Sequence, residues 1–255
     1  MSPHTHPNEV RQPAAQDHLK TKEVRMSDRL VQRFGAASGI VYVVLGIVAG
    51  SIKDAGEAST PPAQAFAQAA ADHTTSTIGS SLTLLAFLAF LCFLSYLYGV
   101  LRRAEGEYGW LAAAAFGGGV MSEAIKLASG APIFAAIHRA SAGLEPQIAQ
   151  TLQDINDASF FLSFFPLAVL LGAAAIVAIR YGALPRWLGW MAAVLAVALL
   201  GGAIVGAFYW VEEAGLPFML FLLWVLVTSI VLVRRVGQPG SAVSSAPAPS
   251  PPIAS

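Results

Sequence analysis

Two side chains of opposite charge, Glu123 and Lys126, lie three residues apart in the apolar stretch "VMSEAIKLASG". Residues three apart are neighbours on a helix, so this carboxylate and this ammonium are placed to form an ion pair. A carboxyl group in an apolar medium can also bind and release a proton, and charges inside membranes commonly mark ion or substrate pathways. A charge at mid-membrane costs at least about 2.5–3.5 kcal/mol on insertion scales. We therefore expect Glu123 to be protonated, paired with Lys126 or facing water.

The composition indicates which kind of element carries this pair. Of 255 residues, 56% are hydrophobic and 12% are charged, whereas a soluble domain has about 25% charged residues. This balance predicts an integral membrane protein with the lipid bilayer as its surroundings. The formal net charge is zero, which gives no reason to expect nucleic acid as a partner.

Motifs for catalysis and metal binding are missing from the sequence. Cys92 is the one cysteine, so there is neither a disulfide within the chain nor a CxxC motif. A phosphate-binding loop, a Gly-x-Ser-x-Gly elbow and a dinucleotide fingerprint are also absent, which weighs against nucleotide and acyl-transfer enzymes. We therefore predict no catalytic residue, no metal and no cofactor.

Six stretches are long enough to cross the hydrocarbon core, which takes about 20 apolar residues. They are Phe34–Ile52, Ile78–Val100, Trp110 to about Gly130, Ala158–Ile179, Leu188–Tyr209 and Leu216–Val233. The predicted fold is therefore all-α, a polytopic bundle of six transmembrane helices over residues 34–236. Residues 1–33 are predicted to be a disordered leader, within which Met26 resembles a natural start, and residues 237–255 a disordered tail rich in Pro, Ser and Ala.

Basic residues alternate between the connections in a way that orients the bundle. Most of them fall at the N-terminus or in the turns that the six spans place on its side of the membrane; the later ones are Arg102, Arg103, Arg180, Arg186, Arg234 and Arg235. Because Lys and Arg favour the cytoplasmic side, both termini are predicted to be cytoplasmic. The expected location is the cell membrane, inner or plasma, with multiple passes.

The two long outer connections are also predicted to contain helix. In residues 53–77, Thr60 is placed to cap a short helix that begins with prolines and continues through "AQAFAQAAAD". In residues 132–157, the segment Ile133–Arg139 extends the third span after a break at "GAP".

The third span has one small and polar side, which is the side expected to face other helices. At 100° per residue, a sector of roughly 100° holds Ala115, Gly118, Gly119, Ser122, Lys126 and Ser129. On the fourth helix, Ser163 lies at about the depth of Glu123, and Pro166 is expected to kink the helix. Asp157 lies near the outer mouth, where we expect it to be within reach of Lys126. We therefore formulate the hypothesis of an outward-facing polar pocket, whose lining residues are Ser122, Glu123, Lys126, Asp157 and Ser163.

Three functions stay open at this stage. The sequence favours a non-enzymatic membrane component that binds a lipid, a membrane protein partner or a second copy, with Glu123 and Lys126 packed and dry. A small transporter or proton-coupled carrier requires a water-filled route to Glu123 and interrupted helices near Pro132 and Pro166. A membrane-embedded enzyme or metal protein requires His73, His138 and outer carboxylates to converge.

The stretch "RYGALPRWLGWMAAVLAVALL", Arg180 to Leu200, resembles a group of bacterial six-helix integral membrane proteins that form a domain of unknown function. That group shows a "GxLPRWLGW" connection before its fifth helix, which Leu184 to Trp190 match. Its members also have an outer-loop helix like "AQAFAQAAADH" and a basic turn like "YGVLRRAEGEYGW". The resemblance implies the topology and no activity.

Overall fold

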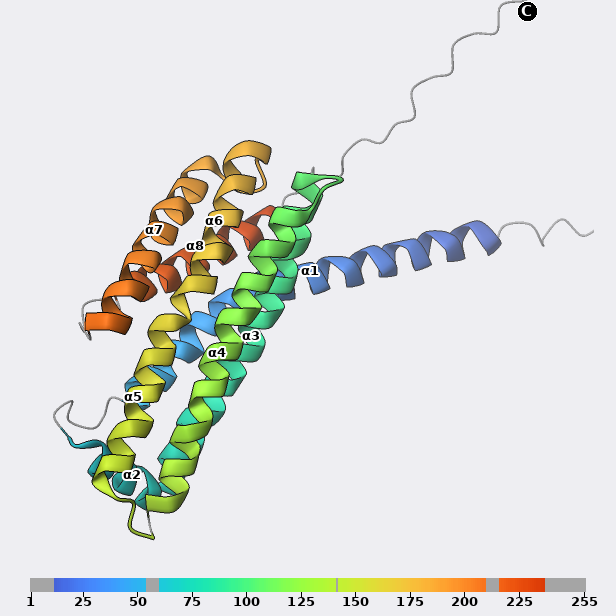
Figure 1. Cartoon of the computed structure of the whole chain (residues 1–255). Helices are drawn as coiled ribbons and strands as arrows, with labels where there is room; N and C mark the ends of the chain where they lie inside the picture. Colours follow the sequence, from blue (N-terminus) through green and yellow to red (C-terminus); the bar gives the residue numbers. More distant parts are fainter. Residues whose placement is uncertain (1–11, 54–59, 141, 210–215, 237–255) are drawn as a thin grey trace, which may run out of the picture.

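The computed structural model describes residues 12–53, 60–140, 142–209 and 216–236. This part of the chain consists of helices joined by short turns and has no strand (Figure 1). The helices are α1 (Gln12–Lys53), α2 (Pro62–Ala71), α3 (His73–Glu105), α4 (Trp110–Ala140), α5 (Pro146–Leu162), α6 (Phe164–Tyr181), α7 (Arg186–Tyr209) and α8 (Leu216–Val236).

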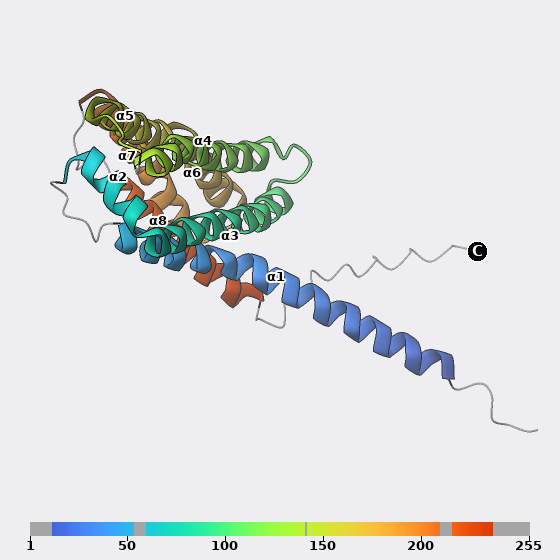
Figure 2. The same ribbon diagram turned by 90° about the horizontal axis from the view of Figure 1, so that it is seen from below.

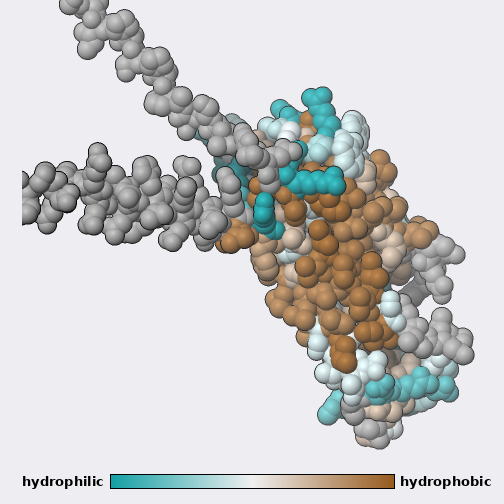
Figure 3. All heavy atoms as spheres, turned by 180° about the vertical axis from the view of Figure 1, so that it is seen from behind, coloured by the Kyte–Doolittle hydropathy of each residue, from teal (hydrophilic) through white to brown (hydrophobic). Residues whose placement is uncertain are grey.

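Six helical segments are long and apolar enough to cross a membrane. They are Leu30–Ile52, Thr74–Glu105, Trp110–Ala140, Pro146–Tyr181, Arg186–Gly206 and Leu216–Val236. The predicted all-α, six-span bundle is therefore confirmed. Its surface carries a broad hydrophobic band between more hydrophilic ends, as expected for a protein surrounded by lipid (Figure 3).

Close approaches between helices fix the directions in which they run. A Cβ added to Gly35 would lie 3.0 Å from Tyr96, and one added to Gly79 would lie 3.4 Å from Ile52, so α1 and α3 are antiparallel. The last turn of α8 meets the turn between α6 and α7, where Nη1 of Arg235 donates to the carbonyl of Ala183 at 2.7 Å. The inner basic turns of the predicted topology therefore share one end of the bundle.

Aromatic rings from α1, α3, α5, α6 and α8 pack together at the centre of the bundle. In the part of this cluster formed by α1, α3 and α8, the ring centroid of Tyr42 lies 4.5 Å from that of Phe90, and Phe90 contacts Phe93 and Phe221. Phe90, Phe93 and Phe221 are completely buried. Because aromatic rings remove large apolar areas and prefer edge and offset contacts, this cluster fixes how α1, α3 and α8 meet.

Beyond the lipid band, α2 and the ends of α4 and α5 form a small extension (Figures 1 and 2). Its core is Phe66, Ala136 and Ala149, one residue from each helix. With 31 residues, α4 is about 46 Å long, which exceeds the hydrocarbon thickness of about 30 Å. The helix therefore continues out of the membrane to carry this extension.

Several predicted boundaries were wrong. The third span does not break at "GAP": α4 continues through Pro132 to Ala140. The helix that carries the fourth span begins at Pro146, twelve residues before the predicted start at Ala158. The outer-loop helix is present as α2, but its cap position is Pro61, with no side-chain hydrogen bond, so Thr60 does not cap it.

The outer parts of the predicted domain scheme are only partly described. α1 begins at Gln12, inside the segment for which the sequence predicts a leader, so residues 12–33 are helical. Residues 1–11 and 237–255 lie outside the described residues. The division at residues 33 and 236 stays a prediction.

An interruption separates α5 from α6 at Ser163, close to the kink predicted at Pro166. Pro166 has no amide hydrogen, so the carbonyl of Leu162 loses its usual partner four residues on. Helical hydrogen bonding resumes at Leu167, whose amide donates to the carbonyl of Ser163 at 3.3 Å. The fourth crossing is thus made of two helical segments end to end.

Candidate functional site

Glu123 and Lys126 form an ion pair at the middle of α4. Nζ of Lys126 lies 2.6 Å from Oε1 of Glu123, and the two side chains are 10% and 12% exposed, lysine first. Their spacing of three residues on one helix places both charges on the same side without any help from tertiary structure.

The lysine is held against an aromatic ring of another helix. Its Nζ lies 5.0 Å from the ring centroid of Phe218 in α8. Phe218 in turn contacts Phe160 of α5 and Phe164 of α6. A cation over an aromatic face is attracted by the ring quadrupole, more strongly when water is excluded. The ammonium is therefore stabilised from two sides, by a carboxylate and by a ring.

The polar atoms beside the pair are less well satisfied. Oε2 of Glu123 and Oγ of Ser122 are buried and have no hydrogen-bond partner among the described residues. An unpaired buried polar atom costs free energy, about 1–3 kcal/mol, and more for a charged group. Tyr42 of α1 lies near enough to Glu123 to interact with it electrostatically. The free carboxylate oxygen thus points into the interior of the bundle.

The face of α4 that carries these residues packs as predicted. Ala115, Gly118, Gly119, Ser122 and Ser129 are all buried, whereas Leu127 on the opposite side is 50% exposed.

Two glycines of this face allow the neighbouring helices to come close. A Cβ on Gly118 would lie 2.5 Å from the carbonyl oxygen of Pro166, and one on Gly119 would lie 2.6 Å from Leu94. Close backbone approach at small residues is the usual basis of helix association in lipid, and here it fixes α4 between α3 and α6.

The other two predicted pocket residues make local hydrogen bonds within α5 and at its end. Oγ of Ser163 donates to the carbonyl of Phe160 at 2.6 Å. Oδ1 of Asp157 accepts from the side-chain amide of Gln153 at 2.8 Å and from that of Asn156 at 3.3 Å. The expected reach of Asp157 to Lys126 is not seen, because Lys126 bonds to Glu123 instead. Ser122, Glu123 and Lys126 are therefore brought together, and Asp157 and Ser163 are occupied elsewhere.

Two hollows of the surface lie away from these five residues. One of about 440 Å³ lies between α6 and α7, and one of about 540 Å³ is lined by residues of α7 and α8. None of the five lines either hollow.

The described residues contain no group of three or more His, Cys, Asp or Glu arranged to hold a metal ion. His138 lies near the end of α4, in the extension. The side chain of His73 is outside the part that the structure describes.

A buried carboxylate that the sequence did not single out closes the turn between α3 and α4. The side chain of Glu105, only 7% exposed, accepts from the amides of Leu111 at 3.0 Å and Ala112 at 2.9 Å. Both amides belong to the first turn of α4 and have no partner within the helix. A glutamate shortly before the helix start "WLAAAA" is the signal that would have identified this cap.

The connection that carries "LPRWLGW" is held to α8 by two hydrogen bonds. The indole Nε1–H of Trp224 donates to the carbonyl of Leu188 at 3.2 Å, and Arg235 donates to Ala183. Gly182 adopts a φ of 71° at the end of α6, in the left-handed region that glycine occupies without strain. These contacts give the motif a structural role, in which a tight turn is locked onto the last helix.

This chain matches no protein-family model, no curated protein and no solved structure. The similarity to bacterial six-helix membrane proteins stays a prediction from the sequence.

Proposed function

We propose that this chain is a non-enzymatic component of a cell membrane, with both termini in the cytoplasm, in which Glu123 and Lys126 form a structural lock. One observation carries the proposal: the two charges are packed together at 2.6 Å with about a tenth of each side chain exposed. Because the sequence resembles bacterial six-helix membrane proteins, the membrane that we propose is the bacterial inner membrane. The positive-inside distribution supports the orientation.

The lock joins helices that are distant in sequence. The ammonium of Lys126 rests on Phe218, and Phe218 contacts Phe160, Phe164 and Phe221. An ion pair in a low-dielectric interior does not need to add net stability, but removing one partner leaves the other charge uncompensated. The pair therefore specifies the position of α4 relative to α8.

Thermal unfolding of the purified protein in detergent tests this role through a double-mutant cycle. Glu123→Gln and Lys126→Met each leave one buried charge, a loss of about 3–5 kcal/mol, which corresponds to a fall in Tm of about 6–20 °C. The double variant removes both charges and is expected to recover most of this loss. Glu145→Gln, on an exposed side chain at the start of α5, is the matched control. Single variants as stable as this control would contradict the structural role.

A proton-coupled carrier is the second candidate, because two observations favour it. The free carboxylate oxygen of Glu123 is buried without a partner, and the fourth crossing is interrupted at Ser163, as in transporters built from broken helices. Proteoliposomes with a trapped pH-sensitive dye distinguish the two candidates. A carrier would lose proton flux in Glu123→Gln while keeping its Tm, whereas a structural lock predicts no flux above that of empty liposomes in either protein.

A further inference from the structure

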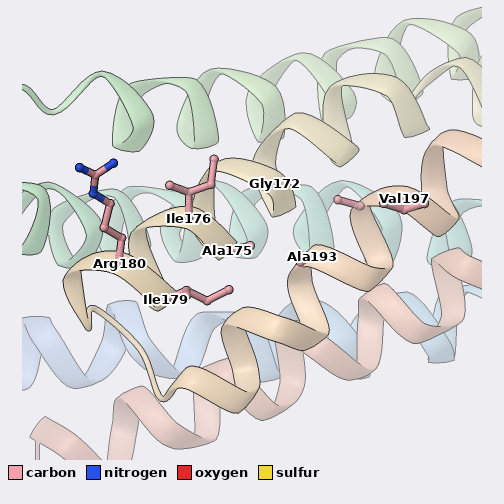
Figure 4. A pocket seen from close by; sticks show the side chains of 8 residues that line it. Gly172, Ala175, Ile176, Ile179, Arg180, Ala193 and Val197 are labelled. Carbon is pink, nitrogen blue, oxygen red and sulfur yellow. The ribbon is translucent and has the colours of Figure 1, made fainter.

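A groove on the outer face of the bundle runs between α6 and α7 (Figure 4). Its volume is about 440 Å³. Small residues form its floor, with Gly172 and Ala175 from α6 and Ala193 from α7. Two larger side chains lie beside them, Ile176 and Val197, which are 47% and 71% exposed. The groove is therefore an apolar furrow open to the surroundings of the bundle, which in a membrane are lipid tails.

The furrow exists because no side chain fills it. A Cβ added to Gly172 would meet nothing within 4 Å. By contrast, the two helices approach closely nearer the turn, where a Cβ on Gly189 would lie 2.9 Å from Ala178 and Ile179. The helices therefore touch closely near the turn, whereas apolar space stays open beside Gly172.

An arginine lies at the end of the furrow nearest the turn. Arg180 is a lining residue (Figure 4), is exposed, and its guanidinium lies 5.7 Å from the ring of Tyr181. Arg186 begins α7 just across the turn and is also exposed. Neither arginine has an acidic partner among the described residues. Two exposed guanidinium groups thus lie near the turn, of which that of Arg180 belongs to the lining of the furrow and that of Arg186 does not.

Exposed aromatic side chains place this end at the level of the lipid headgroups. Tyr181, Trp187 and Trp190 are 39%, 51% and 62% exposed. Such amphipathic rings gather where hydrocarbon meets the polar interface. An acyl chain in the furrow would therefore carry its headgroup to the height of Arg180.

We propose that the furrow between α6 and α7 binds one phospholipid with an anionic headgroup, with an acyl chain along Gly172, Ala175 and Ala193 and the phosphate at Arg180 and Arg186. Guanidinium forks bind phosphate through paired, charge-assisted hydrogen bonds. Basic pockets between transmembrane helices are known to take anionic headgroups. The site shares no residue with the ion pair of Glu123 and Lys126, so it goes beyond the proposed structural role and does not depend on it.

Native mass spectrometry of the detergent-solubilised protein tests the site by titration with palmitoyl-oleoyl phosphatidylglycerol or phosphatidylcholine. The wild type is expected to retain one phosphatidylglycerol at concentrations where phosphatidylcholine is lost. Arg180→Gln is expected to weaken this binding about fivefold. Arg234→Gln, which removes an exposed charge of α8, is its control and is expected to leave the affinity unchanged.

A second pair of variants tests the acyl-chain part of the site. Gly172→Leu places a side chain in the furrow at a position where a Cβ meets nothing within 4 Å, and it is expected to abolish retention of the lipid. Gly201→Leu is its control, because a Cβ there also meets nothing within 4 Å and Gly201 does not line the furrow. Melting temperatures near that of the wild type for both variants confirm that each protein is folded.

Three results would overturn the proposal. Equal retention of phosphatidylcholine would show that the arginines select no anionic headgroup. Unchanged binding in both Gly172→Leu and Arg180→Gln would place the lipid elsewhere. A dimer in the wild type that is lost in Gly172→Leu would show that a second copy of the chain occupies the furrow.

Discussion

Adding a single methyl group to Gly118 should separate α4 from α6. The new Cβ would lie 2.5 Å from the carbonyl oxygen of Pro166 and 2.9 Å from the amide nitrogen of Leu170. Unstrained contacts between heavy atoms of this kind are about 3.5–4.0 Å, so the helices must move apart by about 1 Å. Because the atoms that clash belong to a helical backbone, no side-chain rotation relieves the contact.

The magnitude follows from two opposing terms. Overpacking costs about 1–3 kcal/mol, whereas replacing Gly by Ala within a helix gains about 0.5–1 kcal/mol. The net loss for Gly118→Ala is therefore about 0.5–2 kcal/mol. Its neighbour Gly117 is the matched control, because a Cβ there meets nothing within 4 Å. Gly117→Ala is therefore expected to have the stabilising effect of alanine without the cost of overpacking.

Thermal unfolding in detergent, followed by the fluorescence of the native tryptophans, measures this difference. The two variants are expected to differ by about 1–3 kcal/mol, or about 2–12 °C in Tm, with Gly118→Ala the less stable. A Gly118→Ala protein as stable as Gly117→Ala would refute the packing of α4 against α6, and with it the position of Glu123.

Two further substitutions test the contacts at the basic end of the bundle. Glu105→Ala removes the cap of α4 and is expected to lower the free energy of unfolding by about 1–2 kcal/mol, as measured by thermal melting. The exposed Glu107→Ala is the control, and a loss in Glu105→Ala no larger than in this control would contradict the cap. Arg235→Gln removes the hydrogen bond to the carbonyl of Ala183 and is expected to lower the free energy of unfolding by about 1 kcal/mol in the same assay. Arg234→Gln is expected to leave stability unchanged, and equal melting temperatures of the two variants would show that this hydrogen bond contributes nothing.

The sequence predicted the spans well because hydropathy reports directly on burial in lipid. It predicted helix ends poorly where helices leave the membrane. The start of α5 at Pro146 and the passage of α4 through Pro132 depend on the extension built around Phe66, which stabilises polar and amphipathic helix beyond the bilayer. Such helices have no long apolar run, so a search for spans does not find them.

The candidate site was only partly predictable for a related reason. Glu123 and Lys126 are neighbours on one helix, so their spacing alone predicted the pair. Phe218 and Tyr42 come from the last and first spans, and nothing local in the sequence relates them to α4. Asp157 was placed beside Lys126 on depth alone, whereas its carboxylate bonds to the amides of its own helix.

Labelling of single cysteines from one side of the membrane tests the six-span arrangement most directly. In a Cys92→Ser background, Glu107→Cys and Tyr181→Cys occupy exposed positions beside two basic turns, and Gln147→Cys occupies an exposed position in the extension. A membrane-impermeant maleimide added to intact cells is predicted to label Gln147→Cys and to reach the other two only after the cells are opened. Labelling of Glu107→Cys and Tyr181→Cys from opposite sides would contradict the topology.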